Sequence, residues 1–387
     1  MRFEFSKRLE NLPPYLFAEI DKAKRYARQE GRDLIDLGVG DPDLPTPGHI
    51  IEKLSEAAKD PRNHRYALDQ GIPELRRAIA GWYKRRFNVA LDPETEILPL
   101  IGSKEGIAHM PLAFVNPGDY VLAPDPGYPP YRGSAILSDG QSFSMPLLVE
   151  NSFLPDFKEI PLKIRKKAKL MFLNYPNNPT AAVANKEFYL KVIDFAFKYN
   201  TIIAHDAAYS ELSYAGYRPM SFLELEGAKN TGVEFHSLSK TYNMSGWRIG
   251  WVCGNAHILS GIARVKSNID SGIFSAIQIA GIAALTGPEE HIQKMRALYQ
   301  ERRDVLCAGL ESIGWKASIP QATFYAWVPL PTGSDSRSFA KLLLEKCDIV
   351  AAPGIGFGSS GEGYIRFALT VPKERIAEAV ERIKKRL

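Results

Sequence analysis

The sequence predicts an α/β fold in which a mostly parallel sheet, covered by helices on both faces, is joined to a smaller α+β domain. The first observation is that, up to about residue 287, short apolar runs rich in β-branched residues alternate with amphipathic stretches of helical length. The second is a change of pattern after residue 288, where a long polar helix opens a region with fewer strands. The third is that the 387 residues contain no repeat and no low-complexity linker, which favours two compact domains.

The predicted sheet is built from six short apolar runs. Each run is continuous rather than alternating, as expected for a strand that is buried on both faces. The runs span residues 97–101, 120–123, 169–174, 201–206, 235–238 and 249–253. Amphipathic periodicity predicts the main helices between them at residues 72–86, 104–114, 186–199 and 256–265.

The smaller domain is predicted from the last hundred residues together with a segment near the start of the chain. A polar helix over 289–312 is closed by Gly314 and is followed by strands at 325–328 and 364–367, a helix at 336–346 and a final basic helix. We expect residues 16–47, with a helix near 16–29, to join residues 288–387 in this domain. Residues 48–287 then form the large domain, and residues 1–15 form an N-terminal arm.

Composition excludes several classes of protein. With 45% hydrophobic and 24% charged residues, the chain is neither disordered nor fibrous. Its apolar stretches are too short or too interrupted to cross a membrane, and its first residues lack the apolar core of a signal peptide, so we expect a cytoplasmic protein without a membrane partner. The net charge of +5 is spread along the chain, and the basic cluster at 163–167 is more typical of a solvated face than of a nucleic-acid surface. Three widely spaced cysteines indicate neither disulfide bonds nor a metal site.

Chemistry is expected just after the strands, because ligands of open α/β sheets bind at the carboxyl ends of the strands. Asp206 ends the run 201–206, and Tyr209 follows three positions later. Asn178 lies in an Asn/Pro turn after another run, and Lys240 follows a Ser-Leu-Ser turn. Each has an ordinary interpretation when taken alone, because a loop lysine is usually solvated, a strand-end aspartate often caps a helix and Asn/Pro runs form turns.

Taken together, these residues fit the needs of pyridoxal 5'-phosphate (PLP). An aldehyde cofactor that forms an imine with a lysine needs an acid at its ring nitrogen, a phenol or amide at its ring hydroxyl and an anion site for its phosphate; a lysine with such an aspartate is a recognised PLP pattern. Gly102-Ser103-Lys104, where a strand passes into a helix, suits the phosphate, although it is also an ordinary capping turn. A carboxylate at ~4 Å in an effective dielectric of ~20 contributes about 4 kcal/mol, or roughly three pKa units, toward a protonated ring.

The order of these motifs resembles that of the fold-type-I, class I/II PLP aminotransferases over nearly the whole chain. The motifs are Gly102-Ser103-Lys104, Tyr128, Asn178-Pro179-Thr180, Asp206, Tyr209, Ser237-Leu238-Ser239-Lys240, Arg248 and Arg366. One departure is Ala181, because the family usually has glycine after Asn-Pro-Thr. That difference questions the local turn but not the catalytic set.

The resemblance implies a role for each matching residue. Lys240 forms the Schiff base and moves the proton at the substrate α-carbon, Asp206 pairs with the pyridinium, and Tyr209 and Asn178 bind the ring oxygen. Tyr128 stacks on the ring, while the phosphate is bound by Ser103, the main chain of Lys104, Ser237, Ser239, Arg248 and, from a second subunit, Tyr66. Arg366 clamps the substrate α-carboxylate, a task suited to a planar guanidinium. The implied substrate pocket also includes Gly40, Asn178, Tyr128, Lys104, Tyr15, Tyr66 and Asp69.

Several segments look like those of the LL-diaminopimelate aminotransferases, namely residues 37–43, 63–71, 102–109, 205–209 and 267–274. These enzymes exchange the amino group of LL-2,6-diaminopimelate for the oxo group of 2-oxoglutarate and form tetrahydrodipicolinate in lysine biosynthesis. Aspartate-type relatives read a distal carboxylate with an arginine near 265–271, where this chain has only Lys266 and Asp270. We expect Asp69, contributed across a homodimer interface, to pair with the distal ammonium, and Tyr15 to close the same pocket.

Other functions are compatible with the same motifs. The chain is also interpretable as an aminotransferase for aspartate, alanine or another common amino acid. A PLP lyase or decarboxylase is less well supported, because the sequence does not fix which α-carbon bond lies perpendicular to the ring. A silent PLP-binding regulatory module would usually carry a DNA-binding helix-turn-helix extension, and residues 1–14 are too few for one.

Overall fold

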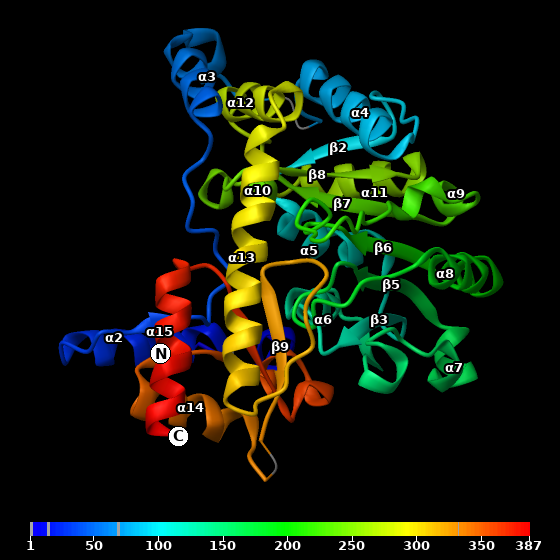
Figure 1. The fold of residues 1–387 in the computed structure, drawn as a ribbon. Helices are drawn as coiled ribbons and strands as arrows, with labels where there is room; N and C mark the ends of the chain where they lie inside the picture. Colours follow the sequence, from blue (N-terminus) through cyan, green and yellow to red (C-terminus); the bar gives the residue numbers. More distant parts are fainter. Residues whose placement is uncertain (1–2, 14–15, 68–69, 332) are drawn as a thin grey trace.

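The computed structural model describes residues 3–13, 16–67, 70–331 and 333–387 (Figure 1). Its largest sheet has seven strands in the order β2-β8-β7-β6-β5-β3-β4. Only β8 runs antiparallel to its neighbours, so the prediction of a mostly parallel sheet is confirmed. The strands are β2 (Ile97–Leu100), β8 (Gly250–Gly254), β7 (Gly232–Ser237), β6 (Ile202–Asp206), β5 (Ala168–Asn174), β3 (Tyr120–Asp125) and β4 (Gln141–Pro146).

Helices cover both faces of this sheet, as Figure 1 shows. Along β5, Leu170 and Phe172 belong to one apolar cluster, whereas Met171 and Leu173 belong to another. Successive side chains of a strand point to opposite faces, so the continuous apolar run is buried on both sides. The helices of this part of the chain are α3 (Gly48–Lys59), α4 (Pro73–Phe87), α5 (Ser103–Phe114), α6 (Pro130–Leu137), α7 (Leu162–Arg165), α8 (Lys186–Tyr199), α9 (Ala228–Thr231), α10 (Leu238–Thr241), α11 (Ala256–Lys266) and α12 (Ser275–Thr286).

Helix ends are specified locally, as α8 illustrates. The side chain of Asn185 accepts a hydrogen bond of 2.9 Å from the backbone N–H of Phe188 and so caps the first turn. The helix stops at Asn200, which adopts a left-handed conformation with φ of 53°. This ending directs the chain into β6 and thus toward Asp206.

A second group of elements surrounds the antiparallel sheet β11 (Ala352–Pro353), β12 (Tyr364–Ala368) and β9 (Tyr325–Pro329). The long helix α13 (Glu290–Ser312) runs from the large sheet to this group in Figure 1. A parallel pair, β1 (Ile35–Asp36) with β10 (Ile349–Val350), attaches the N-terminal segment to it. The remaining helices are α1 (Lys7–Glu10), α2 (Leu16–Gln29), α14 (Ser336–Cys347) and α15 (Lys373–Arg386). The domain boundaries at residues 15, 47 and 287 stay a prediction.

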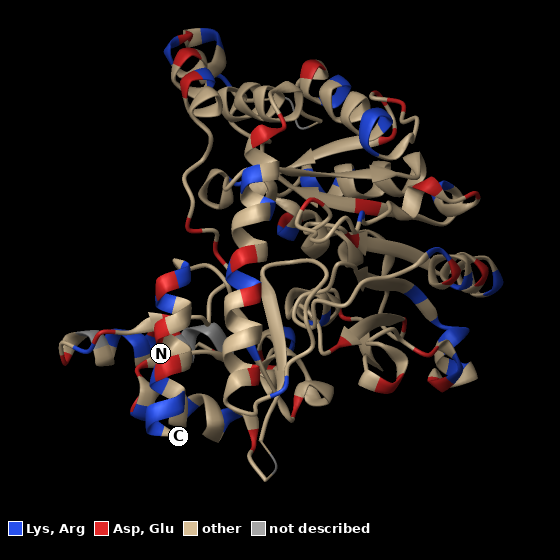
Figure 2. Ribbon diagram, viewed as in Figure 1, with Lys and Arg blue, Asp and Glu red and all other residues tan. Residues whose placement is uncertain are grey.

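Short 3-10 helices complete the chain and include two that border the site described below. They span Pro61–His64, Val149–Asn151, Phe157–Glu159, Phe222–Glu224, Ser245–Trp247, Gly354–Phe357 and Ser359–Gly361. Figure 2 shows acidic and basic residues interspersed on the outer helices, while the strands of the large sheet carry few charges. In the part of the chain that the structure describes, no helix is both long and apolar enough to span a bilayer.

One strand of the large sheet, β4, and the two-residue strands β1, β10 and β11 were not predicted from the sequence, and the predicted run 235–238 ends one residue early. The edge strand β4 has a single buried residue, Met145, because only one side of it pairs with the sheet. Its mixed composition therefore gave no strand signal. Leu238, predicted to end a strand, instead begins the short helix α10 after β7 ends at Ser237.

Candidate active site

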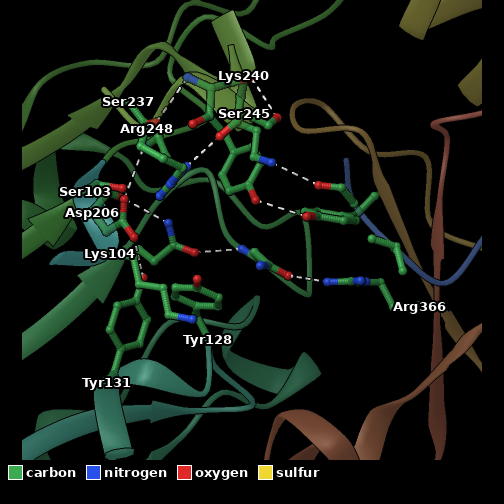
Figure 3. A pocket seen from close by; sticks show the side chains of 18 of the residues that line it. Ser103, Lys104, Tyr128, Tyr131, Asp206, Ser237, Lys240, Ser245, Arg248 and Arg366 are labelled. Atoms are coloured by element: carbon green, nitrogen blue, oxygen red, sulfur yellow. Dashed lines mark hydrogen bonds between the residues drawn. The ribbon is translucent and has the colours of Figure 1, made fainter. Parts of the chain in front are cut away.

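A cavity of about 460 Å³ opens where the strands of the large sheet end (Figure 3). Asn174, Asp206 and Ser237 are the last residues of β5, β6 and β7, so three adjacent strands bring their carboxyl ends to one place. Residues of β9 and β12 close the other side. The lining residues are Asp21, Lys24, Val39, Gly40, Ser103, Lys104, Tyr128, Tyr131, Asn174, Asn178, Asp206, Ala208, Tyr209, Ser237, Ser239, Lys240, Ser245, Arg248, Tyr325 and Arg366.

Most of the residues predicted for the site line this cavity together. Gly40, all the predicted PLP-binding residues except Tyr66, and Arg366 are among its walls. Tyr66 is 91% exposed and lies elsewhere on the surface. Tyr15 and Asp69 lie outside the described residues. Their roles, and those of the residues that do line the cavity, remain predictions.

Lys240 is held on the one-turn helix α10, directly after β7. The side chain of Ser237 caps this turn by accepting a hydrogen bond of 3.1 Å from the backbone of Ser239. The Lys240 ammonium donates to the carbonyl oxygen of Gly40 at 3.0 Å. Burial, aided by the positive charges of Arg248 and Arg366, lowers the pKa of Lys240 from 10.5 to about 8. The amine is therefore much more readily deprotonated than an ordinary surface lysine.

Asp206 presents a buried carboxylate on the floor of the cavity. Its Oδ2 accepts a hydrogen bond of 2.8 Å from the hydroxyl of Tyr131, and its Oδ1 accepts one of 3.3 Å from the backbone of Ala208. Burial raises the pKa of Asp206, while these two hydrogen bonds act in the opposite direction. Tyr131 is itself fixed, because its ring stacks on Phe172 with the centroids 4.9 Å apart.

The start of α5 offers groups at the cavity that suit an anion. Ser103 begins the helix, and Gly102 before it has φ of 78°, a conformation that glycine tolerates best. A Cβ atom on Gly102 would collide with the guanidinium of Arg248, so glycine at this position lets Arg248 lie close to the start of α5. Arg248 is oriented by donating a hydrogen bond of 2.6 Å to the carbonyl of Ser245. Hydroxyls, helix N–H groups and a guanidinium suit a phosphate at this position.

Arg366 occupies the opposite wall and is 2% exposed. It donates hydrogen bonds of 2.8 Å to Oδ1 of Asn178 and 2.7 Å to the carbonyl of Gly38. Its guanidinium carbon lies 4.2 Å from the ring centroid of Tyr325 and 4.7 Å from that of Phe357. The two rings hold the guanidinium in place, and its planar donors suit a substrate carboxylate. Because Oδ1 of Asn178 already accepts from Arg366, the amide nitrogen of Asn178 is the group that can donate to an acceptor in the cavity.

Several residues of the site were missed by sequence reasoning. The cavity also contains Tyr131 and Tyr325, and the hydroxyl of Tyr325 lies 3.0 Å from that of Tyr209. Neither missed tyrosine stands in a recognisable motif, and each becomes visible only through a partner that is distant in sequence. The other lining residues not singled out from the sequence are Asp21, Lys24, Val39, Asn174, Ala208 and Ser245.

The structure shows how two features noted in the sequence are accommodated, namely Ala181 in place of the usual glycine and Lys266 in the segment where aspartate-type relatives have an arginine. Ala181 has φ of 59°, so an alanine occupies a left-handed conformation that favours glycine. The Lys266 ammonium is buried and pairs with Asp270 at 2.6 Å and Glu105 at 3.3 Å. Two carboxylates thus already neutralise the cation that the sequence offered near 265–271.

The charge of the cavity favours anions. Five cationic side chains line it, against the two carboxylates of Asp21 and Asp206. The cations are Lys24, Lys104, Lys240, Arg248 and Arg366. Lys24 is already paired with Asp36 at 2.6 Å and Asp21 at 3.3 Å, so a phosphate and a substrate carboxylate would mainly balance the charges of the other cations.

Comparison with known proteins identifies the family of this chain. The sequence profile of the family described as Aminotransferase class I and II matches residues 32–383. The chain therefore belongs to the class I and II aminotransferases. An LL-diaminopimelate aminotransferase of Syntrophobacter fumaroxidans is 56% identical over 385 residues, covering 100% of this chain and 99% of the relative. One from Moorella thermoacetica is 54% identical over 380 residues, covering 98% and 97%. Apo-BacF from Bacillus subtilis superposes with a TM-score of 0.96 at 40% identity, covering 100% of this chain and 98% of that structure.

Proposed function

We propose that this aminotransferase uses PLP to transfer an amino group from LL-2,6-diaminopimelate to 2-oxoglutarate, giving glutamate. The ketone left on the donor condenses with the remaining amine, losing water, to form tetrahydrodipicolinate. One observation carries the proposal: the cavity with Lys240 and Asp206 occurs in a chain that is 54–56% identical, over nearly its full length, to proteins named for this activity.

When bound, PLP would supply an aldehyde that exchanges imines with amines and a ring that accepts electrons from the α-carbon. Lys240 would hold the aldehyde and then move the proton at the substrate α-carbon, a task aided by its lowered pKa. Asp206 would keep the ring nitrogen protonated, and the cradle formed by Ser103, Ser237, Ser239 and Arg248 would hold the phosphate. Arg366 would orient the substrate carboxylate.

Lys266 is not expected to receive the distal carboxylate of aspartate, because it is paired with two carboxylates and does not line the cavity. A lysine already neutralised by Asp270 and Glu105 is a poor receptor for a second substrate carboxylate. The distal end of diaminopimelate also carries an ammonium group, for which Asp69 remains the proposed partner. Because Asp69 lies outside the described residues, this assignment rests on the sequence.

We also propose a homodimer with shared active sites, in which Tyr66 reaches the PLP phosphate of the partner subunit. A tyrosine that is 91% exposed, on a chain whose own cavity it does not line, is consistent with such a position. Mixing a Lys240→Ala variant with a Tyr66→Ala variant tests this arrangement, because a hybrid dimer would contain one site with both native residues. Recovery of activity on mixing is expected. Activity no greater than the sum of the separate variants would refute the shared site.

The substrate is tested with a panel of amino donors. Glutamate formation from 2-oxoglutarate is measured with LL-diaminopimelate, aspartate and alanine as donors. LL-diaminopimelate should give the highest kcat/KM, and a higher value for aspartate or alanine would reject the substrate while leaving an aminotransferase.

Asp69→Ala tests the distal contact. It should lower kcat/KM about 5- to 100-fold for LL-diaminopimelate, the equivalent of an unpaired polar group costing roughly 1–3 kcal/mol. The reverse half-reaction with glutamate as donor serves as the control, because glutamate has no distal ammonium. Equal losses for both donors would refute the role of Asp69.

A further inference from the structure

Tyr325 contacts two parts of the site that have separate proposed tasks. It begins β9, is 2% exposed and lines the cavity. Its hydroxyl lies 3.0 Å from the hydroxyl of Tyr209, which would bind the cofactor ring oxygen. Its ring centroid lies 4.2 Å from the guanidinium carbon of Arg366, which would bind the substrate carboxylate. One side chain therefore touches both the ring-oxygen donor and the carboxylate clamp.

The direction of the hydrogen bond between the two tyrosines follows from proton counting. A phenol has a single O–H to donate, although its oxygen also accepts. If Tyr209 donates its proton to the ring oxygen of the cofactor, it has none left for Tyr325. Tyr325 must then be the donor in the 3.0 Å pair, and its donation makes the Tyr209 O–H a stronger donor in turn.

The position of Tyr325 is fixed by its surroundings on both sides. On the sheet, Tyr325 pairs with Ala368 of β12, the strand that also carries Arg366. Toward the N-terminal segment, its hydroxyl packs so closely on Gly40 that a Cβ atom there would collide with it. The carbonyl of Gly40 accepts the hydrogen bond from Lys240 at 3.0 Å. A shift of the Tyr325 hydroxyl would therefore also disturb the segment that orients the lysine.

We propose that Tyr325 is a positioning residue that supports Tyr209 through its hydroxyl and Arg366 through its ring. The inference rests on the proposed PLP chemistry and goes beyond it by dividing one side chain into two separable functions. The hydroxyl sets the proton affinity of the lysine-bound cofactor by way of Tyr209. The ring sets the affinity for carboxylate substrates by way of Arg366.

Two substitutions separate these functions. Tyr325→Phe removes the hydroxyl and keeps the ring, whereas Tyr325→Leu removes both. The first readout is the pH midpoint of the visible absorbance of the lysine-bound cofactor. The second is the dissociation constant of 2-oxoglutarate for the PLP form, which binds this keto acid without reacting. Neither readout depends on turnover.

Tyr325→Phe should raise the absorbance midpoint by about half a unit to one unit, because a weaker donor at the ring oxygen stabilises the deprotonated form less. It should leave 2-oxoglutarate binding within about twofold of the wild type. Tyr325→Leu should raise the midpoint similarly and also weaken 2-oxoglutarate about three- to tenfold, through loss of the cation–π contact.

Tyr299→Phe is the matched control. Tyr299 is buried in the same apolar cluster as Tyr325, does not line the cavity, and its hydroxyl has no hydrogen-bond partner among the residues described. This variant should behave as the wild type in both measurements. A midpoint for Tyr325→Phe equal to that of Tyr299→Phe would overturn the role of the hydroxyl.

A double-substitution cycle tests whether the effect passes through Tyr209. Tyr209→Phe should raise the midpoint, and adding Tyr325→Phe to it should change the midpoint no further, because the hydroxyl that Tyr325 supports is gone. Additive shifts would overturn the proposed route. Tyr325→Phe preserves volume, so this cycle tests the role of the hydroxyl even if Tyr325→Leu does not fold. Unchanged 2-oxoglutarate binding by a folded Tyr325→Leu would overturn the role of the ring. A wild-type chain that develops no visible absorbance with PLP would refute the proposed function itself.

Discussion

The lowered pKa of Lys240 predicts how fast the cofactor-free protein attaches PLP at different pH values. Only the neutral amine attacks the aldehyde. With a pKa of about 8, roughly one amine in ten is neutral at pH 7, whereas an ordinary lysine with a pKa of 10.5 would have about one in three thousand. Burial should therefore give about 300 times more neutral amine at pH 7 than an exposed lysine would have, which favours covalent attachment at this pH.

The assay follows the visible absorbance after mixing cofactor-free protein with PLP at a series of pH values. The rate should rise about tenfold per pH unit below 8 and level off above it. Asp41→Asn should move the bend to lower pH, because the charge of Asp41 raises the pKa of Lys240. Lys240→Ala should bind PLP without covalent attachment and should not transaminate. A rate that keeps rising past pH 10 would refute the reasoning, since it would mean that the amine titrates like a solvated lysine.

Three further substitutions have predicted outcomes. Tyr131→Phe removes a hydrogen bond to the buried carboxylate of Asp206. It should raise the dissociation constant of PLP about tenfold more than that of 1-deaza-PLP, an analogue with a carbon in place of the ring nitrogen. An equal rise for both ligands would contradict the proposed contact. Glu234→Gln should lower the free energy of unfolding in urea by about 3–5 kcal/mol at pH 7, because a buried carboxylate with five hydrogen-bond partners is lost. Hydrogen bonds from two histidines hold the pKa of Glu234 below its usual 4.5, so this stabilisation is present above pH 4.5 and lost as the pH falls. The free energies of unfolding of the wild type and Glu234→Gln should therefore converge in acid. A difference that stays constant with pH would contradict the reasoning. Lys266→Met should cost about 2–3 kcal/mol in the same assay, because it leaves two partly buried carboxylates without their cation, and an unchanged midpoint would show that the triad is not stabilising.

The sequence predicted the large sheet well because its strands are short, apolar and buried on both faces. The order of strands was not predictable in the same way. The antiparallel β8 lies between β2 and β7, and its direction depends on the path of the chain through α10 and the loop after it rather than on its own residues. The edge strand β4 was not predicted because Met145 is its one buried residue, so it has no continuous apolar run.

The site was predictable where its residues stand in short motifs and not where they depend on pairing across the fold. Asp206 ends β6 and Lys240 lies just after β7, and the topology of an open α/β sheet brings strand ends together. Tyr131 is 75 positions from its partner Asp206, and Tyr325 is 116 positions from Tyr209. No local pattern connects such pairs, so a single sequence gives no signal for them.

The two tyrosines that were not predicted from the sequence support their partners in the same way. Asp206 and Tyr209 would act at two different atoms of the cofactor ring, and each is supported by a buried tyrosine, Tyr131 from α6 and Tyr325 from β9. A phenol adds a hydrogen bond without adding a charge, since burial raises the pKa of both tyrosines and keeps them neutral. The two tyrosines therefore support Asp206 and Tyr209 without changing the charge of the cavity, in which Arg248 and Arg366 are the proposed partners of phosphate and carboxylate. For this reason substitutions at the two supporting tyrosines should alter the cofactor spectrum more than the attraction of the cavity for anions.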